Sequence, residues 1–419
     1  MAPQTARRVH VVGAGLAGLA ASLRLAEAGV AVVLHEAARQ AGGRCRSYDD
    51  ATLGCRIDNG NHLMIAGNTA AMAYLRAIGA ADTLIGPPEP AYPFLDLASG
   101  ERWVVRPNSG RLPWWLFDAA RRVPGTRTLD YLRALRLAFA GRDDTVADLL
   151  DPTATIFHRL WQPLAVAALN TEVEHGAATL LGRVLRESFG AGGSACRPLV
   201  PREGLSESLI DPALARLASL GVELRLGSRL RAIDIAGERV ATLGFDAGSE
   251  TLAPGEAMVL AVTAAVAARL LPGLAAPDEF RAIVNAHYRI AAPADSPLFV
   301  GLVGGAAEWV FRKREVLSVT ISAGDRFIDT PADELAALLW RDVARAYELR
   351  DAALPPWQIV KERRATFAAT PAQLRRRPPA ATRWANLALA GDWTDTGLRA
   401  TIEGAIRSGF AAAAHLRRV

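Results

Sequence analysis

The sequence predicts an α/β fold in which one Rossmann-like nucleotide-binding sheet is assembled from three separated stretches of chain, with an α+β domain inserted between them. Three observations support this prediction. The N-terminal stretch Val9–His35 has the pattern of a strand, an alanine-leucine helix and a second strand, which is one βαβ unit of about 30 residues. The stretch 256–273 has the pattern of a buried strand followed by a helix. The stretch Leu387–Leu416 repeats that pattern near the C-terminus.

These stretches divide the chain into two discontinuous domains. We expect a nucleotide-binding domain at 1–95, 195–275 and 381–419, and an inserted substrate domain that also faces a membrane at 96–194 and 276–380. Alternating apolar residues from Gly221 to Phe245 predict a β-meander, because the side chains of a strand alternate between its faces. Apolar residues at helical spacing predict helices at Ser206–Leu220 and Pro331–Glu348.

The composition indicates a globular protein that binds no nucleic acid. The 419 residues are 51% hydrophobic and 22% charged, which is enough for two or three domains with cores of their own. The net charge is +5 and nearly all basic residues are arginine, but no basic helix or zinc-finger spacing is present. A mild positive balance suits an anionic membrane surface or acidic ligands.

The cysteines and the apolar runs indicate in which cellular compartment the protein works. Cys45, Cys55 and Cys196 form no CxxC pair and are odd in number, which predicts structural thiols in the reducing cytoplasm and neither a disulfide framework nor a metal site. The apolar N-terminal run is interrupted by glycines and by Arg24 and Glu27, unlike a signal anchor. Because no other apolar run reaches the roughly 20 residues that span a bilayer, we expect a soluble protein or one bound to the inner face of the membrane.

A glycine-rich turn follows the first predicted strand. In a GxGxxG turn the first glycine allows the bend, the second lets a pyrophosphate approach the backbone, and the third lets helix and strand pack closely. The free N–H groups at the start of the helix then favour the anion. Glu36 ends the second strand, about 20 residues further on, where a carboxylate can accept hydrogen bonds from ribose hydroxyls. The residues of the turn are Gly13, Ala14, Gly15, Leu16, Ala17 and Gly18.

A second glycine pair, Gly42 and Gly43, precedes Arg44. This segment resembles the second motif of the FAD-dependent flavoproteins with two dinucleotide-binding domains, the superfamily of the flavin amine oxidases and carotenoid desaturases. The resemblance implies that FAD is the cofactor and that Arg44 helps to hold its pyrophosphate. Without the resemblance, Arg44 is equally well interpreted as a surface arginine.

The same resemblance implies a second half of the flavin site at the other end of the chain. Gly391 and Asp392 follow the apolar strand "LALA", and by resemblance the aspartate binds the ribityl and phosphate region. The following helix would direct the N–H groups of Thr401 and Ile402 at the flavin, where they would stabilise negative charge on the reduced ring. The segment around Leu230 resembles the one that covers the adenine through backbone contacts.

Four stretches are more specific than the general flavin pattern. They resemble the hydroxysqualene dehydroxylase family of hopanoid biosynthesis, also called squalene-associated FAD-dependent desaturases. The sequence departs from that family at Asn61, where glutamine is expected, near Gly67 and Asn68, where a tyrosine is expected, and at Arg399, where proline is expected. The stretches are Asp58–Leu63, Leu160–Phe189, Lys361–Pro371 and Leu389–Gly409.

The resemblance implies the reductive loss of an allylic hydroxyl from a C30 isoprenoid, giving squalene. Such a reaction needs a hydride donor, an acid that protonates the departing hydroxyl, and a long apolar cavity. The candidate acids are His62, Asp58 and Glu403, and the sequence leaves other acids and the reductant of FAD open. The other candidates for the proton donor are Glu172, Glu174, His175 and Glu362.

The stretch Leu112–Val123 combines Trp114–Phe117 with Arg121 and Arg122. It suits either a helix that lies on a membrane and draws an apolar substrate from lipid, or a core helix with a basic edge. Three other functions stay open for the chain as a whole. It could be a carotenoid or phytoene desaturase, a flavin amine oxidase that uses Lys313 or Lys361, or a non-enzymatic escort for prenyl lipids.

Overall fold

The computed structural model describes residues 8–349 and 353–417. Within these residues a parallel sheet has the strand order β10-β2-β1-β14-β20, and its strands come from three separated segments, as predicted. The prediction that the β-meander begins at Gly221 is wrong for its first strand. That strand, β10, pairs in parallel with β2 and extends the parallel sheet instead. The bounds are β1 Arg8–Val12, β2 Ala31–Glu36, β10 Glu223–Leu226, β14 Ala257–Leu260 and β20 Leu387–Leu389.

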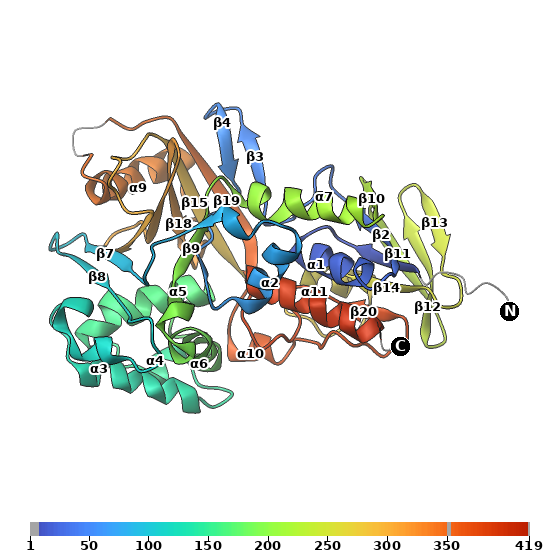
Figure 1. Ribbon diagram of the computed structural model, residues 1–419, viewed down its shortest axis with the longest axis horizontal. Helices are drawn as coiled ribbons and strands as arrows, with labels where there is room; N and C mark the ends of the chain where they lie inside the picture. Colours follow the sequence, from blue (N-terminus) through green and yellow to red (C-terminus); the bar gives the residue numbers. More distant parts are fainter. Residues whose placement is uncertain (1–7, 350–352, 418–419) are drawn as a thin grey trace.

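Helices cover one face of this sheet and a β-meander covers the other. On the first face, α1 (Leu16–Ala26) and α11 (Ile402–Leu416) lie side by side, with α7 (Asp211–Ser219) next to α1 (Figure 1). Their apolar side chains form one core cluster with the inward residues of β1 and β2. The meander on the second face consists of β11 Leu230–Ala236, β12 Arg239–Phe245 and β13 Gly248–Thr251.

A second, mostly antiparallel sheet has the order β19-β15-β18-β17-β16-β7-β8 in the described part of the chain. Helix α9 (Ala332–Ala346) packs on it. Strand β7 begins at Tyr92, so this sheet takes in the end of the stretch that was assigned to the nucleotide-binding domain. The bounds are β7 Tyr92–Asp96, β8 Arg102–Val105, β15 Phe280–Arg289, β16 Phe299–Val303, β17 Trp309–Lys313, β18 Val316–Ile321 and β19 Trp357–Phe367.

The remaining elements are short, and two of them correct the sequence predictions. The expected helix Ser206–Leu220 is a π-helical turn, Ser206–Ile210, that continues into α7. The expected helix at 112–123 is two 3-10 turns, Trp114–Phe117 and Ala119–Arg121. The other bounds are β3 Ser47–Asp50, β4 Cys55–Asp58, β5 Met64–Ile65, β6 Leu84–Ile85, β9 Pro198–Pro201, α2 Thr69–Ala77, α3 Thr128–Leu132, α4 Val146–Leu149, α5 Gln162–Leu169, α6 Ala178–Glu187, α8 Ala264–Leu270 and α10 Pro371–Leu374.

The strand register positions the site. Val12 pairs with His35 on one side and with Leu260 on the other, so the carboxyl ends of the parallel strands lie at one edge of the sheet. In open α/β sheets, ligands bind in the crevice at that edge. The glycine turn after β1, Glu36 at the end of β2 and Gly391 after β20 all leave the sheet there.

Candidate active site

The glycine turn after β1 is closed toward the protein and open at Gly15. Gly13 has a φ of 107°, a conformation that favours glycine. A Cβ on Gly13 would lie 2.4 Å from the carbonyl oxygen of Ala261, and one on Gly18 would lie 1.8 Å from the carbonyl oxygen of Gly13. Apart from Gly15 itself and its two chain neighbours, no described atom lies within 4 Å of a Cβ built on Gly15. The open side fits a phosphate group that rests on the backbone.

Helix α1 directs its N-terminus at this opening. Gly15 is the N-cap, and no acidic residue occupies the first turn, so nothing in that turn neutralises the positive end of the helix dipole. The N–H groups of Leu16 and Ala17 belong to the first turn, where donors have no acceptor within the helix. These donors match an anionic pyrophosphate.

Glu36 is held beside the glycine turn by two backbone hydrogen bonds. The Ala14 N–H donates to one carboxylate oxygen at 2.8 Å, and the Ala38 N–H donates to the other at 2.9 Å. The oxygens keep lone pairs for ribose hydroxyls, whereas the Ala14 N–H is used within the protein. The Ser228 N–H donates to the Glu36 carbonyl at 2.8 Å. Because the Leu230 side chain is buried, a contact from that segment to adenine would come from its backbone.

The second glycine pair packs against the first turn. The Gly42 N–H donates to the Ala14 carbonyl at 2.8 Å, and Gly42 forms a β-bridge with Gly15. Gly42 and Gly43 have φ angles of 109° and 57°, both in the region that favours glycine. The residue that follows them, Arg44, is thereby directed toward the C-terminal half of the predicted site.

Arg44 and Asp392 meet in an ion pair, although 348 positions of sequence separate them. One terminal nitrogen of Arg44 lies 2.7 Å from both carboxylate oxygens, and the other donates to the carbonyl of Ala365. The negative charge of Asp392 raises the pKa of Arg44, and this effect outweighs the loss of solvation around the partly exposed guanidinium group. The two motifs inferred from opposite ends of the chain therefore form one contiguous site.

The turn that carries Asp392 is fixed by a residue that the sequence did not single out. The Arg377 guanidinium is buried and donates to the carbonyl oxygens of Asp392, Trp393 and Thr394. The Gly391 N–H donates to the Ser408 hydroxyl on α11 at 2.8 Å. Burial lowers the pKa of Arg377 to about 10, so it remains charged at neutral pH and holds three carbonyl groups.

Helix α11 begins at the predicted position. Thr401 is the N-cap, and its hydroxyl accepts a hydrogen bond from the Gly404 N–H at 3.0 Å. Ile402 is the first helical residue, so its N–H has no acceptor within the helix. The Thr401 and Ile402 backbone thus offers donors at a helix N-terminus, in agreement with the geometry expected for a flavin that gains negative charge.

Glu403, a predicted proton donor, is buried as the cap of another helix. Its two oxygens accept hydrogen bonds from the N–H groups of Ala70 and Ala71, at 3.1 and 2.8 Å, in the first turn of α2. It also forms an ion pair with Arg407 at 2.9 Å. Both carboxylate oxygens of Glu403 are therefore engaged within the protein, and these contacts give no support to Glu403 as the proton donor.

Asp58 is paired with Lys313, a residue 255 positions away. The Lys313 ammonium group contacts one oxygen of the buried Asp58 carboxylate, and the Leu205 N–H donates to the other at 2.9 Å. Burial raises the pKa of Asp58, but the charge and the hydrogen bond of Lys313, with further hydrogen bonds, lower it overall. At neutral pH Asp58 is a carboxylate that positions Lys313, and it carries no proton to donate.

The loop after Asp58 contains two polar groups that the protein does not fully use. The His62 Nδ1 lies 3.4 Å from the Gly60 carbonyl, and burial, together with the nearby Lys313 charge, lowers its pKa. Asn61 donates to the Thr320 hydroxyl at 3.0 Å, but its buried Oδ1 has no hydrogen-bond partner among the described residues. Such an acceptor fits a ring N–H of a bound flavin, so the Asn61 departure is compatible with the cofactor.

A cavity of about 300 Å³ lies beside the Asp58 and Lys313 pair. His287 lines it, with its Nδ1 on the Ser318 hydroxyl and its buried Nε2 without a partner among the described residues. Burial lowers the pKa of His287 to about 4, so the ring is neutral. His287 is a second imidazole near Asp58 that sequence reasoning missed, because it lies on β15, far from every motif.

Neither of two cavities in the described part of the chain has the apolar lining expected for a C30 substrate. The larger, of about 800 Å³, lies between α11 and the Gly67 loop and is lined by Arg186, Arg197, Arg407 and Glu187. Many apolar side chains of the segment 96–194 instead pack into one core cluster with side chains of the antiparallel sheet, among them Phe94, Phe299 and Phe311.

The remaining residues singled out from the sequence lie in different environments. Burial lowers the pKa of Arg399 to about 10, and the charge of Glu187 opposes the shift. Glu172 lies 3.8 Å from Arg326, Glu362 is partly buried, and Glu174 and His175 are exposed. The cysteines are free, with Cys45 and Cys196 buried.

Comparison with known proteins places this site in a class. The family model described as flavin containing amine oxidoreductase matches residues 16–417. A putative protoporphyrinogen oxidase from Exiguobacterium sp. 255-15 has a similar fold, with a TM-score of 0.69 at 17% identity over 99% of both chains. The chain therefore belongs to the flavin-containing amine oxidoreductases.

Curated relatives define a narrower family. Proteins named hydroxysqualene dehydroxylase from Rhodopseudomonas palustris and Sinorhizobium fredii are 52% and 48% identical to this chain, over 97% of each protein. A probable zeta-carotene desaturase from Synechococcus elongatus is 25% identical over 97% of this chain. Within the flavin-containing class, the chain belongs to the hydroxysqualene dehydroxylase family.

Proposed function

We propose that this chain removes the hydroxyl group of hydroxysqualene and yields squalene, with FAD as its cofactor. The observation that carries the proposal is the end-to-end identity of 52% with a protein named hydroxysqualene dehydroxylase. The site supports it, because the glycine turn, Glu36, Arg44 and Asp392 converge at one edge of the parallel sheet. Bound and reduced, FAD supplies the hydride that replaces the hydroxyl.

The chain's own residues must then assist the departure of the hydroxyl, since hydroxide leaves poorly without a proton. His62 is the proposed donor. The Asp58 carboxylate holds Lys313 and adjoins the loop that carries His62. The pKa of His62 is lowered, so the protonated donor becomes abundant only below the usual imidazole range. The Asp58 and Lys313 pair would position the loop and set the local charge.

Other functions of the superfamily are less well supported. The lysines weighed for an amine oxidase are both engaged, Lys313 with Asp58 and Lys361 with the carbonyl groups of Ile328 and Thr330. A desaturase related to the zeta-carotene enzyme would oxidise its polyene and reduce the flavin, which is the reverse direction of electron flow. A prenyl-lipid escort would have no need of the intact FAD site.

We further propose that the enzyme meets its substrate at a lipid surface. Trp115 and Leu116 are buried, whereas Trp114 and Phe117 are 51% and 79% exposed. We name the large apolar residues of 112–139 that remain exposed the apolar surface. Exposed arginines at 111, 127, 133 and 136 lie among them, which suits anionic headgroups. The members are Leu112, Trp114, Phe117, Leu129, Leu132, Leu135 and Phe139.

This proposal concerns attachment to one face of a bilayer. Among the described residues, no helix is long and apolar enough to cross a membrane. The segment 112–123 therefore acts through its exposed side chains on two 3-10 turns rather than as one amphipathic helix.

Product analysis tests the proposed function. The purified protein is loaded with FAD, reduced without oxygen and incubated with hydroxysqualene, and the extract is analysed for squalene. Squalene is the expected product. Peroxide release from simple amines would favour an amine oxidase, a more unsaturated product would favour a desaturase, and a protein unable to take up FAD would favour an escort.

A further inference from the structure

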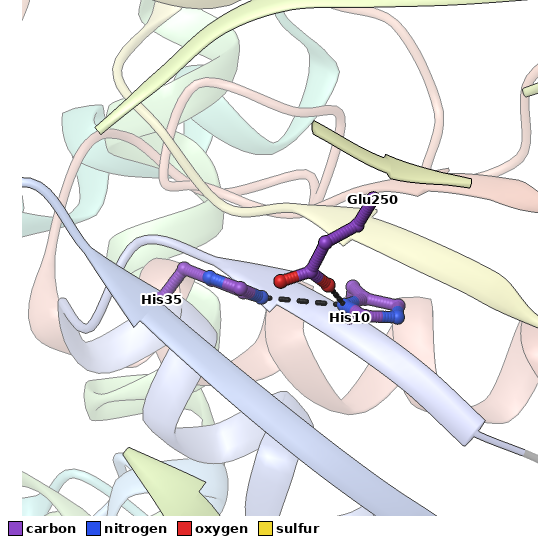
Figure 2. A group of neighbouring side chains, drawn as sticks. All are labelled: His10, His35 and Glu250. Carbon is purple, nitrogen blue, oxygen red and sulfur yellow. Dashed lines mark hydrogen bonds and ion pairs between the residues drawn. The ribbon is translucent and has the colours of Figure 1, made fainter. Parts of the chain in front are cut away.

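Two histidines and a glutamate meet on the face of the parallel sheet opposite α1. His10 lies on β1, His35 on β2, and Glu250 reaches them from β13 of the meander (Figure 2). His10 is 3% exposed and His35 is fully buried, whereas the Glu250 side chain is 31% exposed. The cluster is thus buried on the sheet side and accessible on the meander side.

The spacing of their donor atoms matches a metal coordination shell. The His10 Nδ1 lies 3.2 Å from the His35 Nε2 and 3.3 Å from a Glu250 carboxylate oxygen, and all three atoms lie within 4.8 Å of one another. Zinc binds histidine nitrogen and carboxylate oxygen at about 2.0–2.1 Å in a tetrahedron, whose edges are then about 3.3 Å. Two of the three edges already have this length.

The protonation states suit a cation. Burial lowers the pKa of His10, although Glu250 opposes the shift, and burial lowers the pKa of His35 to about 4. Both imidazoles are therefore neutral at pH 7 and keep a lone pair for a metal. The charged groups that act on the two histidines sum to −1, from three carboxylates and two guanidinium groups. They are Glu223, Glu250, Glu256, Arg8 and Arg225.

The residues that surround the two histidines and the glutamate are arranged like the residues that surround the ligands of known metal sites. The His35 Nδ1 lies 3.0 Å from the Ser228 hydroxyl, which leaves the Nε2 directed at the cluster. The His35 ring stacks on Phe245 with centroids 4.4 Å apart. Arg225 binds the other oxygen of Glu250. Partners of this kind orient metal-binding imidazoles and carboxylates in known sites.

We propose that the His10 Nδ1, the His35 Nε2 and a Glu250 carboxylate oxygen bind a divalent transition-metal ion, zinc being the best match. Two imidazoles and one carboxylate suit zinc better than magnesium or calcium, which prefer oxygen ligands alone. Water completes the tetrahedron from the exposed side of Glu250. Sequence spacing does not reveal the set, because its ligands come from three strands and form no local motif.

The ion would tie the meander to the parallel sheet next to the cofactor. His35 directly precedes Glu36, and the Ser228 that contacts His35 also donates its N–H to the Glu36 carbonyl at 2.8 Å. A metal here has a structural role: it fixes β13 against β1 and β2 and steadies the residue that faces the ribose. No step of the proposed reaction passes through it.

Zinc titration of the tag-free, FAD-loaded protein tests the proposal. After removal of metal with a chelator, we expect one zinc ion to bind per chain and the melting temperature to rise with zinc concentration, because a ligand that binds only the native state stabilises it. Cobalt, used as a spectroscopic probe, is expected to give the visible absorption of a tetrahedral site.

Two matched variants separate ligation from general electrostatics. Glu250→Gln removes a proposed ligand at a partly exposed position, and we expect zinc affinity to fall about tenfold or more. Glu223→Gln removes the other carboxylate that pairs with Arg225, at 2.7 Å, but no ligand, and is expected to lower zinc affinity much less than Glu250→Gln does. Absence of stoichiometric zinc in the wild type, or equal zinc binding by both variants, would overturn the proposal.

Discussion

The Arg44 and Asp392 pair links the two halves of the proposed cofactor site. The 2.7 Å contacts neutralise a carboxylate that is 9% exposed, next to the place where a pyrophosphate and a ribityl chain are expected. Because each partner is the counter-ion of the other, loss of either leaves a partly buried charge without compensation. We therefore propose that the pair contributes both to the fold around β20 and to the affinity for FAD.

Arg44→Met is expected to lower the free energy of unfolding by about 1–3 kcal/mol, since the pair is partly exposed and solvent screens it. It should also weaken FAD binding about tenfold or more, because the charge near the phosphates is lost. Denaturant unfolding and flavin fluorescence titration measure the two effects. Arg39→Met removes the same charge at an exposed neighbouring position and should leave both quantities unchanged. Equal losses in the two variants would reject a specific role for Arg44.

His62 determines the expected pH dependence. Burial and Lys313 lower its pKa, so the imidazolium that can donate a proton accumulates only below the usual value near 6.5. The rate of dehydroxylation should therefore rise as the pH falls through the lowered His62 pKa. A pH profile of single-turnover rates measures it, and His62→Gln should lose that rise while retaining FAD. An unchanged profile in the variant would assign the proton to another group.

At the scale of the elements, the contact between α1 and α11 joins the N-terminal and C-terminal parts of the site. Gly409 makes this contact possible, because a Cβ on it would lie 2.2 Å from the carbonyl oxygen of Ala17. The two helices begin at Leu16 and Ile402, the positions proposed to face the pyrophosphate and the flavin. Their close packing therefore fixes the spacing of the two helix N-termini.

Gly409→Ala tests this packing, because the close contact predicts a loss of stability where an exposed helix would gain stability from the same change. In an exposed helix, alanine is more favourable than glycine by about 1 kcal/mol. Here the added methyl group meets backbone, and we expect destabilisation of about 1–3 kcal/mol together with weaker FAD binding. Thermal or denaturant unfolding measures it. A more stable variant would show that the helices are free to move apart.

The sequence predicted those elements whose signal is local. The strand, glycine turn and helix after Val9 could be recognised because each glycine has a backbone reason to be there. The structure confirms a strand, a helix and a second strand in this stretch, and the two strands extend it by one residue at each end, to Arg8 and Glu36. The sequence predicted β10 as part of the meander because its apolar and polar residues alternate in the same way whether the strand joins the meander or the parallel sheet. Only the pairing with β2 decides between the two.

The roles of individual side chains were less predictable, because they depend on contacts distant in sequence. The sequence does not show that Asp58 pairs with Lys313, and this pairing keeps its carboxylate ionised. Nor does it show that Glu403 accepts hydrogen bonds from the first turn of α2 and caps that helix. His287 and Arg377 carry no motif at all. Candidate FAD residues could be named at both ends of the chain because a family resemblance supplied the distant half of the site, which the spacing of residues alone does not. The structure brings Arg44 and Asp392 together, and their contact with FAD stays a prediction.

At the scale of the whole molecule, the parallel sheet and the helical segment of the substrate region lie toward opposite ends of the long axis (Figure 1). The apolar surface belongs to that helical segment, where Phe117 and Phe139 are 79% and 87% exposed. Large exposed apolar side chains interspersed with arginines are the observation on which the proposed membrane contact rests. A substrate as apolar as hydroxysqualene would be held in the same membrane.

Phe117→Ser and Phe139→Ser should each weaken binding to phosphatidylglycerol vesicles about tenfold, since burying a phenylalanine side chain contributes about 1.5–3 kcal/mol. Vesicle co-sedimentation measures the affinity. Leu354→Ser, at a residue 41% exposed and outside the segment, is the control and should bind like the wild type. Equal binding by all variants would exclude the apolar surface as the lipid contact.

We propose that this chain uses a split FAD site to dehydroxylate hydroxysqualene. The most direct test is an anaerobic single turnover, in which the reduced, FAD-loaded protein is mixed with hydroxysqualene while flavin absorbance and squalene are followed together. We expect one squalene to form per flavin oxidised and both changes to occur at the same rate. Flavin that stays reduced in the presence of hydroxysqualene, or that is oxidised without squalene, would contradict it.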